Sequence, residues 1–164
     1  MALETAPASQ PSTGKWRITF VPTGSNALSA AILVGATSYD LTYGFTPDGF
    51  NRVFNETAVE DPRLTMSQVL SQPGSYTEIL EVKYVESVTA GSASVILVDG
   101  LTGFLSIRRG VSAATVWTSA QKADVITFVA GKRRNDPPVA NGLDTISQTL
   151  YLTAATQNQA TIVS

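Results

Sequence analysis

The side chains able to carry chemistry in this sequence are carboxylates, basic groups and hydroxyls, because the chain contains neither histidine nor cysteine. The missing histidine removes the commonest general base and the commonest transition-metal ligand. The missing cysteine removes thiolate nucleophiles, thiolate metal sites and disulfides. We therefore expect no enzyme activity, no metal site and no cofactor.

One acidic group lies in the stretch 46–62 and consists of Glu56, Glu60 and Asp61. These carboxylates lack the fixed spacing of oxygen ligands that a calcium loop requires. We interpret them as a solvated acidic segment and not as a metal site or a catalytic carboxylate pair.

A second acidic group, Glu78, Glu81 and Glu86, lies on or beside a predicted strand over residues 76–87. Glu78 and Glu86 share one face of such a strand, and Glu81 lies on the other. The charges either face solvent or line a channel whose wall repels phosphate groups. The sequence leaves both interpretations open.

Two short basic clusters are present: Arg108 and Arg109, and Lys132, Arg133 and Arg134. Neither is interleaved with the aromatic side chains of a single-strand binding surface, and the net charge of −2 does not favour phosphate neutralisation. Basic residues at strand ends also oppose edge aggregation. We interpret these residues as surface groups or as partners in ion pairs between subunits.

The elements that position these groups are mostly strands. The 164 residues, of which 43% are hydrophobic, are enough for one core and one domain. Alternating or short apolar runs predict strands beginning at residue 15 and over 38–45, 76–87, 104–109, 124–131 and 145–153, with a further strand possible at 63–70. Residues 92–99 predict one short helix. The run at 28–35 is too short to distinguish a buried strand from a helical turn, and we favour a strand or loop there. We expect a mainly β fold, either a β-sandwich or a barrel.

Residues 46–62 predict a long loop, because proline, glycine, aspartate and asparagine are interleaved with Phe50, Val53 and Phe54. Loops of this length are usually functional or disordered, and exposed phenylalanines need something to pack against. Residues 72–75 predict a turn.

The two ends of the chain predict extended arms, over residues 1–14 and 154–164, around a β domain of residues 15–153. The second arm ends in Thr161, Ile162 and Val163, which could add as an edge strand to a neighbouring molecule. The first arm lacks the apolar run of a signal peptide, and apolar windows elsewhere fall short of the roughly 20 residues that cross a bilayer. We expect a protein made in the cytoplasm, with no membrane partner.

Several segments resemble a known family in their order and combined coverage, which extends from about Trp16 to Leu152. They are residues 40–52, 61–65, 72–74, 100–104, 108–110, 121–125, 136–138 and 145–150. Together they resemble the major tail tube proteins of long, non-contractile-tailed actinobacteriophages. No single segment is diagnostic by itself.

The resemblance implies a β-sandwich or barrel with one short flanking helix. Six copies would form a ring whose inner sheets join into a β-barrel around a DNA channel, and rings would stack into the tube for genome ejection. It implies an inter-ring loop carrying Phe50, Arg52, Val53, Phe54, Glu56, Glu60 and Asp61, and arm contacts through Leu3, Ile162 and Val163. The net charge of −2 departs from an acidic channel unless the negative residues are sorted inward.

The implied partners are other copies of the chain, a tape measure protein, tail tip or terminator proteins, and DNA that passes without sequence-specific binding. The implied location is the virion tail, after assembly in the host cytoplasm. Two alternatives remain: another virion protein of similar fold, such as a tail terminator or capsid decoration protein, or a carbohydrate-binding, adhesin-like module. The last would use Trp16, Trp117 or Tyr151, although Trp16 lies on an alternating apolar face that predicts core.

Overall fold

The computed structural model describes residues 9, 11–63, 68 and 70–164. These residues form a mainly β fold with nine strands in one sheet. The strands are β1 Trp16–Pro22, β2 Tyr39–Asp40, β3 Phe45–Asp61, β4 Leu70–Val85, β5 Thr102–Arg109, β6 Lys122–Ala130, β7 Arg134–Asn135, β8 Thr145–Leu152 and β9 Gln157–Thr161. Two short helices, α1 Ala30–Val34 and α2 Ala93–Ile96, and one 3-10 turn, η1 Thr42–Gly44, lie between them. The mainly β prediction is confirmed.

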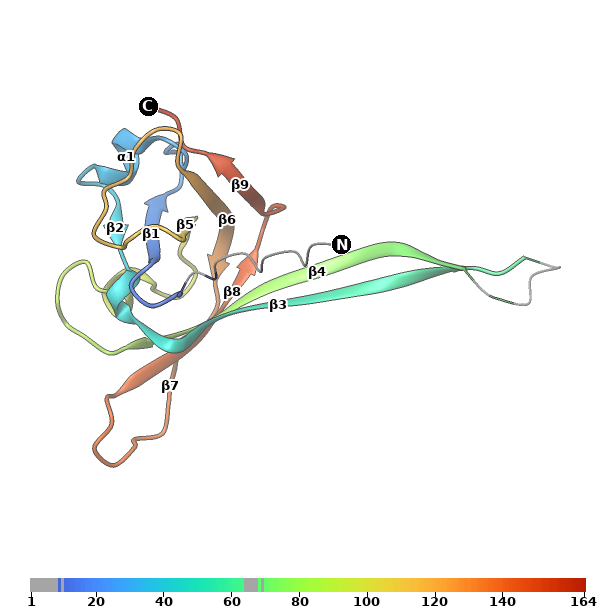
Figure 1. The fold of residues 1–164 in the computed structure, drawn as a ribbon. Coiled ribbons are helices and arrows are strands. Elements are labelled where there is room, and N and C mark those ends of the chain that lie inside the picture. Colours follow the sequence, from blue (N-terminus) through green and yellow to red (C-terminus); the bar gives the residue numbers. More distant parts are fainter. Residues whose placement is uncertain (1–8, 10, 64–67, 69) are drawn as a thin grey trace, which may run out of the picture.

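The sheet is antiparallel and rolls into a barrel-like body. Its strand order is β2-β1-β5-β6-β8-β4-β3, with β7 beside β8 and β9 beside β6. Strands near opposite ends of this order meet again, because the ring centroids of Trp16 in β1 and Phe50 in β3 are 6.0 Å apart. Figure 1 shows the rolled body and a long hairpin of β3 and β4 that projects from it.

The core fills the inside of the body and follows the alternation of the strands. On β4, Leu80, Val82 and Tyr84 are buried while Glu81 between them is exposed. The other buried members come from β1, β5, β6 and β8, from α2 and its C-cap, and from the turn before η1: Ile18, Phe20, Leu105, Ile107, Ile126, Phe128, Ala130, Ile146, Leu150, Ala93, Leu97 and Leu41. The predicted alternation of the strands at 76–87 and 145–153 is therefore confirmed. Strand β6 is central in the sheet, because it pairs with β5, β8 and β9.

A second apolar cluster covers the outer face of β1, β5 and β6. Val21, Leu33 of α1, Trp117, Val125 and Ile162 are its main buried members. The prediction of a strand or loop at 28–35 is wrong, because good helix formers follow Ser29 and the helix buries Leu33 against this cluster. The prediction of Ile162 as a free arm contact is wrong as well, since Ile162 is 1% exposed in its own chain.

Other predicted elements are shorter than expected. The strand predicted at 38–45 is reduced to Tyr39–Asp40, and Tyr43 in η1 is 89% exposed. The helix predicted at 92–99 is α2, which has four residues and Ser92 at its N-cap. The strand predicted at 63–70 falls mostly outside the described residues, as does the predicted arm contact Leu3. Among the described residues, no helix is long and apolar enough to span a membrane.

The predicted loop at 46–62 is instead strand β3, and the predicted turn at 72–75 lies within β4. Backbone pairing between the two strands outweighs the local turn propensities, which are accommodated in register shifts at Phe45/Phe50 and Glu56/Ala58. Gly49 lies in the first of these bulges. A Cβ there would approach the Lys83 carbonyl oxygen to 2.1 Å, so the close strand contact requires glycine.

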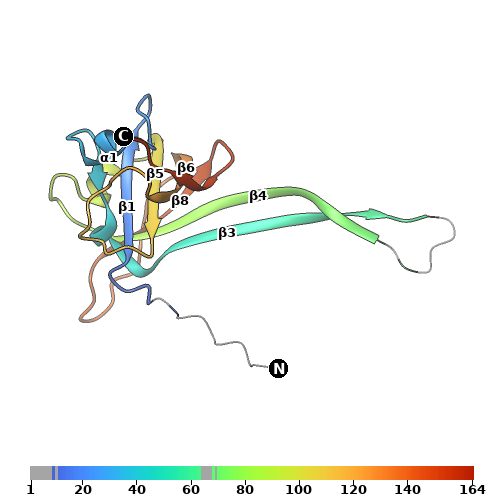
Figure 2. The same cartoon turned by 45° about the horizontal axis from the view of Figure 1, so that its top comes forward.

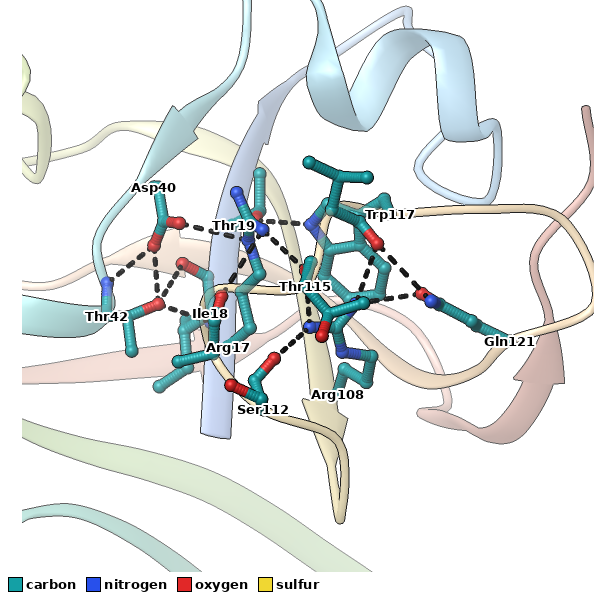
Figure 3. Close-up of polar contacts among 12 residues, drawn as sticks. Arg17, Ile18, Thr19, Asp40, Thr42, Arg108, Ser112, Thr115, Trp117 and Gln121 are labelled. Carbon is teal, nitrogen blue, oxygen red and sulfur yellow. Dashed lines mark hydrogen bonds and ion pairs between the residues drawn. The ribbon is translucent and has the colours of Figure 1, made fainter. Parts of the chain in front are cut away.

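Arg108 is a structural residue of the body, although the sequence predicted an inter-subunit ion pair for it. It is 1% exposed, and its Nη2 donates to the carbonyl oxygens of Ser112 at 2.8 Å and Thr115 at 2.7 Å. Its Nη1 donates to Gln121 Oε1 at 2.8 Å, and its guanidinium lies over the Trp117 ring at 4.9 Å (Figure 3). Burial lowers the pKa of Arg108, and these acceptors stabilise the charged form. The inter-subunit prediction for Arg108 is therefore wrong.

Arg17 of β1, which lies opposite Arg108 on the neighbouring strand, holds the same 110–120 loop. Arg17 and Arg108 are cross-strand partners, so their like charges oppose each other. Arg17 Nη1 also donates to the Thr115 carbonyl at 2.8 Å, and Arg17 Nε pairs with Asp40 at 3.0 Å. The carbonyls and this carboxylate offset the repulsion, as the contacts in Figure 3 show.

We predict that Arg108→Met lowers the free energy of unfolding by about 2 to 4 kcal/mol, because the carbonyls that fix the 110–120 loop lose the charged donor that Arg108 supplies from a buried position. Urea unfolding of the dilute, unassembled subunit at neutral pH measures this change. The control is Arg63→Gln, whose side chain is 72% exposed and paired with Asp61, and which should change stability by less than about 0.5 kcal/mol. Equal midpoints for the two variants would contradict the structural role of Arg108.

Candidate functional site

The β3–β4 hairpin extends well past the body. The two strands pair from Phe50 and Val82 outward to Asp61 and Leu70, whereas pairing of β4 with β8 ends at Ile79. Figures 1 and 2 show from two directions that the outer part of the hairpin extends away from the labelled helices and strands of the body. At about 3.3 Å per residue, the eight residues 54–61 project by roughly 25 Å.

Large apolar side chains are exposed on this projection. Phe54 and Tyr76 stack with ring centroids 5.0 Å apart, yet they are 55% and 51% exposed. Val59 and Leu70 nearer the tip are also about half exposed. A two-stranded hairpin is only marginally stable in water, and an exposed apolar patch of this kind marks a contact surface. The hairpin therefore has the character of an element that packs against another molecule.

The outer edge of β3 is a free strand edge. Within the part of the chain that the structure describes, β3 pairs with β4 alone along its 17 residues. Proteins usually protect such an edge with lysine, proline or a short length, but residues 50–59 contain neither lysine nor proline. This edge is a template for backbone pairing with another chain.

A buried ion-pair network holds the base of the hairpin. Arg52 of β3 donates from Nε to Oε1 of Glu78 at 2.6 Å, and the Glu78 side chain is only 8% exposed. Thr156 donates to the other Glu78 oxygen at 2.9 Å. The contact joins both hairpin strands to the segment that leads into β9.

Asp124 of β6 extends the same network into the body. It is 3% exposed and accepts from Arg109 Nη2 at 2.8 Å and from the Gln159 backbone N–H at 2.8 Å. Arg52 Nη1 lies 3.8 Å from Asp124 Oδ2, the same oxygen that Arg109 contacts. Two guanidinium groups thus balance two buried carboxylates, which is the arrangement that makes burial of charge tolerable. Strands β3, β4, β5 and β6 and the C-terminal segment are tied at one point.

The predicted inter-ring residues divide between the body and the projection. Phe50 packs in the body against Trp16 and Phe45, and Arg52 belongs to the buried network. The remaining members lie from the hairpin base outward: Val53, Phe54, Glu56, Glu60 and Asp61.

The predicted acidic and basic groups are dispersed. Glu78 is buried in the network, so its assignment to a channel wall is wrong. Glu81 lies on the opposite face, and Glu86 is exposed beyond the end of β4.

The predicted basic clusters divide in the same way. Arg109 pairs within the chain with Asp124, and Arg133 pairs with Asp99. Lys132 and Arg134 line a polar depression beside Glu81 and have no ion-pair partner among the described residues. Val163 of the predicted arm is half exposed and bridges Ser29 in parallel.

Sequence reasoning missed Asp124 and the C-terminal residues that complete the network. The available signal was a carboxylate at the start of an apolar strand, in phase with the buried Ile126 and Phe128. A charge on a core-facing position requires a partner, but the sequence does not identify Arg52 and Arg109 as the partners.

The described residues offer little for catalysis. No three acidic, histidine or cysteine side chains among them converge as metal ligands would. Burial raises the pKa of Tyr84 to about 12, and its hydroxyl donates to Gln148 inside the core. Hydrogen bonds from Ser147 and Thr145 lower the pKa of Asp136, which pairs with Lys83 at 3.2 Å. Both groups have structural partners and neither adjoins a nucleophile and base pair.

Comparison with known proteins agrees with an assembly role. A family model described as phage tail tube protein matches residues 3–164, which is nearly the whole chain. No curated protein matches the chain.

We predict that Arg52→Met loosens the hairpin while leaving the body folded, because Glu78 loses its charged partner in a buried position. Hydrogen exchange should accelerate at least tenfold in residues 50–56 and 76–80 and little in β5. The partial exposure of Arg52 limits the loss of global stability to about 1 to 3 kcal/mol.

The matched control is Glu56→Gln on the same strand, where the side chain is exposed. It should leave the exchange rates within about twofold of the parent, since a lone surface charge contributes little. Unchanged exchange in Arg52→Met would show that the ion pair does not hold the hairpin.

Proposed function

The chain belongs to the phage tail tube protein family, and from this premise we propose that its copies form hexameric rings which stack into the tube for genome ejection. Tail tube proteins are structural components of the virion tail. A tape measure protein and tail tip or terminator proteins would be further partners, and assembly would take place in the host cytoplasm.

The projecting β3–β4 hairpin is the observation that carries the proposal. It combines a free strand edge along β3 with the exposed pair Phe54 and Tyr76. Where β3 runs along the body, pairing of its edge with a strand of the next copy would satisfy the unpaired backbone N–H and C=O groups of that edge. When one head-to-tail contact is repeated between copies, the copies close into a ring if the rotation from one copy to the next is a whole fraction of a full turn.

The outer part of the hairpin is suited to contacts between rings. At the rise per residue of a β-strand it extends roughly 25 Å past the body. This length would let it contact a subunit of the next ring that the body itself does not touch. Burial of Phe54, Tyr76 and Leu70 would then supply the apolar contact that a lone hairpin lacks. Among the residues assigned to this role from sequence, Phe50 and Arg52 serve the hairpin base instead.

The other candidate functions fit less well. A carbohydrate-binding module needs exposed aromatic platforms, but Trp117 is 2% exposed and Trp16 packs against Phe50 and Arg109. Of the three candidate side chains, Tyr151 alone is exposed. A tail terminator or decoration protein would share the fold and form single rings or isolated subunits instead of tubes.

We predict that the purified full-length chain forms long tubes with a regular axial repeat in negative-stain electron microscopy. Isolated rings without stacking would favour a terminator, and dispersed monomers at high concentration would contradict the proposal.

We further predict that Phe54→Asp combined with Tyr76→Asp prevents stacking, because two charges replace the apolar pair at the ring contact. Both side chains are exposed in the subunit, so its unfolding midpoint should change little. The control is Tyr43→Asp, an equally drastic change at a site that is 89% exposed and lies in η1, outside the projecting part of the hairpin. Tubes of normal length in the double variant would exclude a stacking role for this pair.

A further inference from the structure

The loop that joins β7 to β8 presents two exposed apolar side chains. Val139 and Leu143 are each 70% exposed. Residues 137–143 carry no formal charge, so water alone surrounds the pair in the free subunit. Figure 1 shows this loop projecting from the body beyond β7. An exposed apolar pair on a projecting loop indicates a contact with another molecule.

The loop has a fixed shape before any contact forms. At its base, Asp136 accepts hydrogen bonds from the hydroxyls of Thr145 and Ser147, both at 2.8 Å. Two consecutive prolines follow Asp136 and restrict the backbone. At the tip, the Gly142 N–H donates to the Val139 carbonyl oxygen at 2.9 Å and closes a turn. A preformed loop loses less conformational entropy on docking than a flexible one.

An uncharged groove opens on the body between the start of β1 and the start of β3. Its volume is about 380 Å³. Its apolar lining consists of Trp16, Ile18, Phe45, Pro47 and Phe50, and the other lining residues are serine and threonine. Strands β1 and β3 are not paired with each other, so the groove lies along the open seam of the rolled sheet.

The strand register places the loop and the groove at opposite ends of one row of residues. Asn135 of β7 pairs with Ile146 of β8, which pairs with Tyr84 of β4. Tyr84 in turn pairs with Phe45 of β3, which lines the groove. The loop begins one residue after Asn135. Among the described residues, β7 pairs only with β8 and β3 only with β4, so these two strands are the margins of this part of the sheet.

We infer that the 137–143 loop of one copy inserts Val139 and Leu143 into the groove of a neighbouring copy; this inference rests on the proposed function. Each strand in the series β7, β8, β4 and β3 is antiparallel to the next. Pairing of the β3 edge with β7 of the next copy would continue this alternation. The next copy's loop would then lie beside Phe45, at the place where the groove opens.

The groove and the loop match in chemistry. Neither carries a formal charge, so their contact removes no ion from water. The contact covers aliphatic side chains on one copy and aromatic side chains on the other. The tip of the β3–β4 hairpin is a second apolar candidate for the groove, but it would bring Glu60, Asp61 and Arg63 with it. The uncharged loop is therefore the better occupant.

Paired cysteines test the inference, because the natural chain has none. Thr13 lines the groove and is exposed, so a chain with Thr13→Cys and Val139→Cys carries one thiol on each surface. In assembled tubes, a short bismaleimide crosslinker should link neighbouring copies into a ladder of up to six. The yield should be at least tenfold higher than with either single variant. Dilute, unassembled subunits should give no ladder.

The comparison pair is Thr13→Cys with Val59→Cys, which places the second thiol on the hairpin at a site 55% exposed. A ladder from this pair and none from the Val139 pair would show that the groove receives the hairpin, which overturns the inference. Normal tubes that give no ladder with either pair overturn it as well and leave the proposed function intact. Failure of the parent chain to assemble would contradict the proposed function, and this contact with it.

Charge substitution gives an independent readout of the same contact. Val139→Asp combined with Leu143→Asp should reduce the amount of sedimenting tubes at least tenfold, because two charges would enter an uncharged groove. Both side chains are exposed, so the unfolding midpoint of the subunit should stay the same. The matched control is Val88→Asp, at a site 97% exposed, which should assemble like the parent. Normal assembly of the double variant would overturn the inference.

Discussion

The long backbone ladder between β3 and β4, with the buried charges at its base, is the constraint on which the rest of this structure depends. A hairpin of 17 and 16 residues has far more hydrogen-bonding length than the body uses, since β8 supports β4 only as far as Ile79. The outer half has no third strand and no core beneath it among the described residues. Its direction must therefore be set where it leaves the body, and the Arg52–Glu78 pair lies at that point.

A charged network sets the direction of the hairpin differently from apolar packing. Charge-assisted hydrogen bonds fix the relative position of donor and acceptor strands, whereas apolar contacts tolerate small slides. Asp124 receives Arg109 and the backbone of Gln159, so the angle of the hairpin is coupled to β5, β6 and the C-terminal segment. The expected energetic gain is small, because desolvation offsets most of the attraction between buried ions. Positional definition is the larger contribution, and a subunit that must fit identical neighbours requires it.

The body was predictable from sequence where burial alternates along a strand. The segments at 76–87 and 145–153 correspond to β4 and β8, where period-two burial is visible in residue type. The segments at 104–109 and 124–131 correspond to β5 and β6, which were predictable as short apolar runs and are buried on both faces because the second apolar cluster covers their outer side. Strand β3 was not predictable by this route. Its outer half has no core beneath it, so Asn55, Glu56 and Thr57 show no apolar alternation, and Pro47 and Gly49 indicate a turn. Strand pairing is a tertiary property, and no local pattern in β3 encodes the length of β4.

The residues of the candidate site also divide into those that a local pattern predicts and those that depend on strand pairing. Phe54 was predictable as an interaction residue, since an aromatic in a polar stretch needs a partner, but its partner Tyr76 comes from the opposite strand and depends on register. Arg108 and Arg109 are adjacent in sequence and alternate across β5, so one enters the outer loop while the other faces Asp124. A basic pair that looks like a surface cluster in the sequence therefore consists of two residues with separate partners, one in the outer loop and one at Asp124. Both arginines find their partners inside the chain, which residue type alone does not reveal.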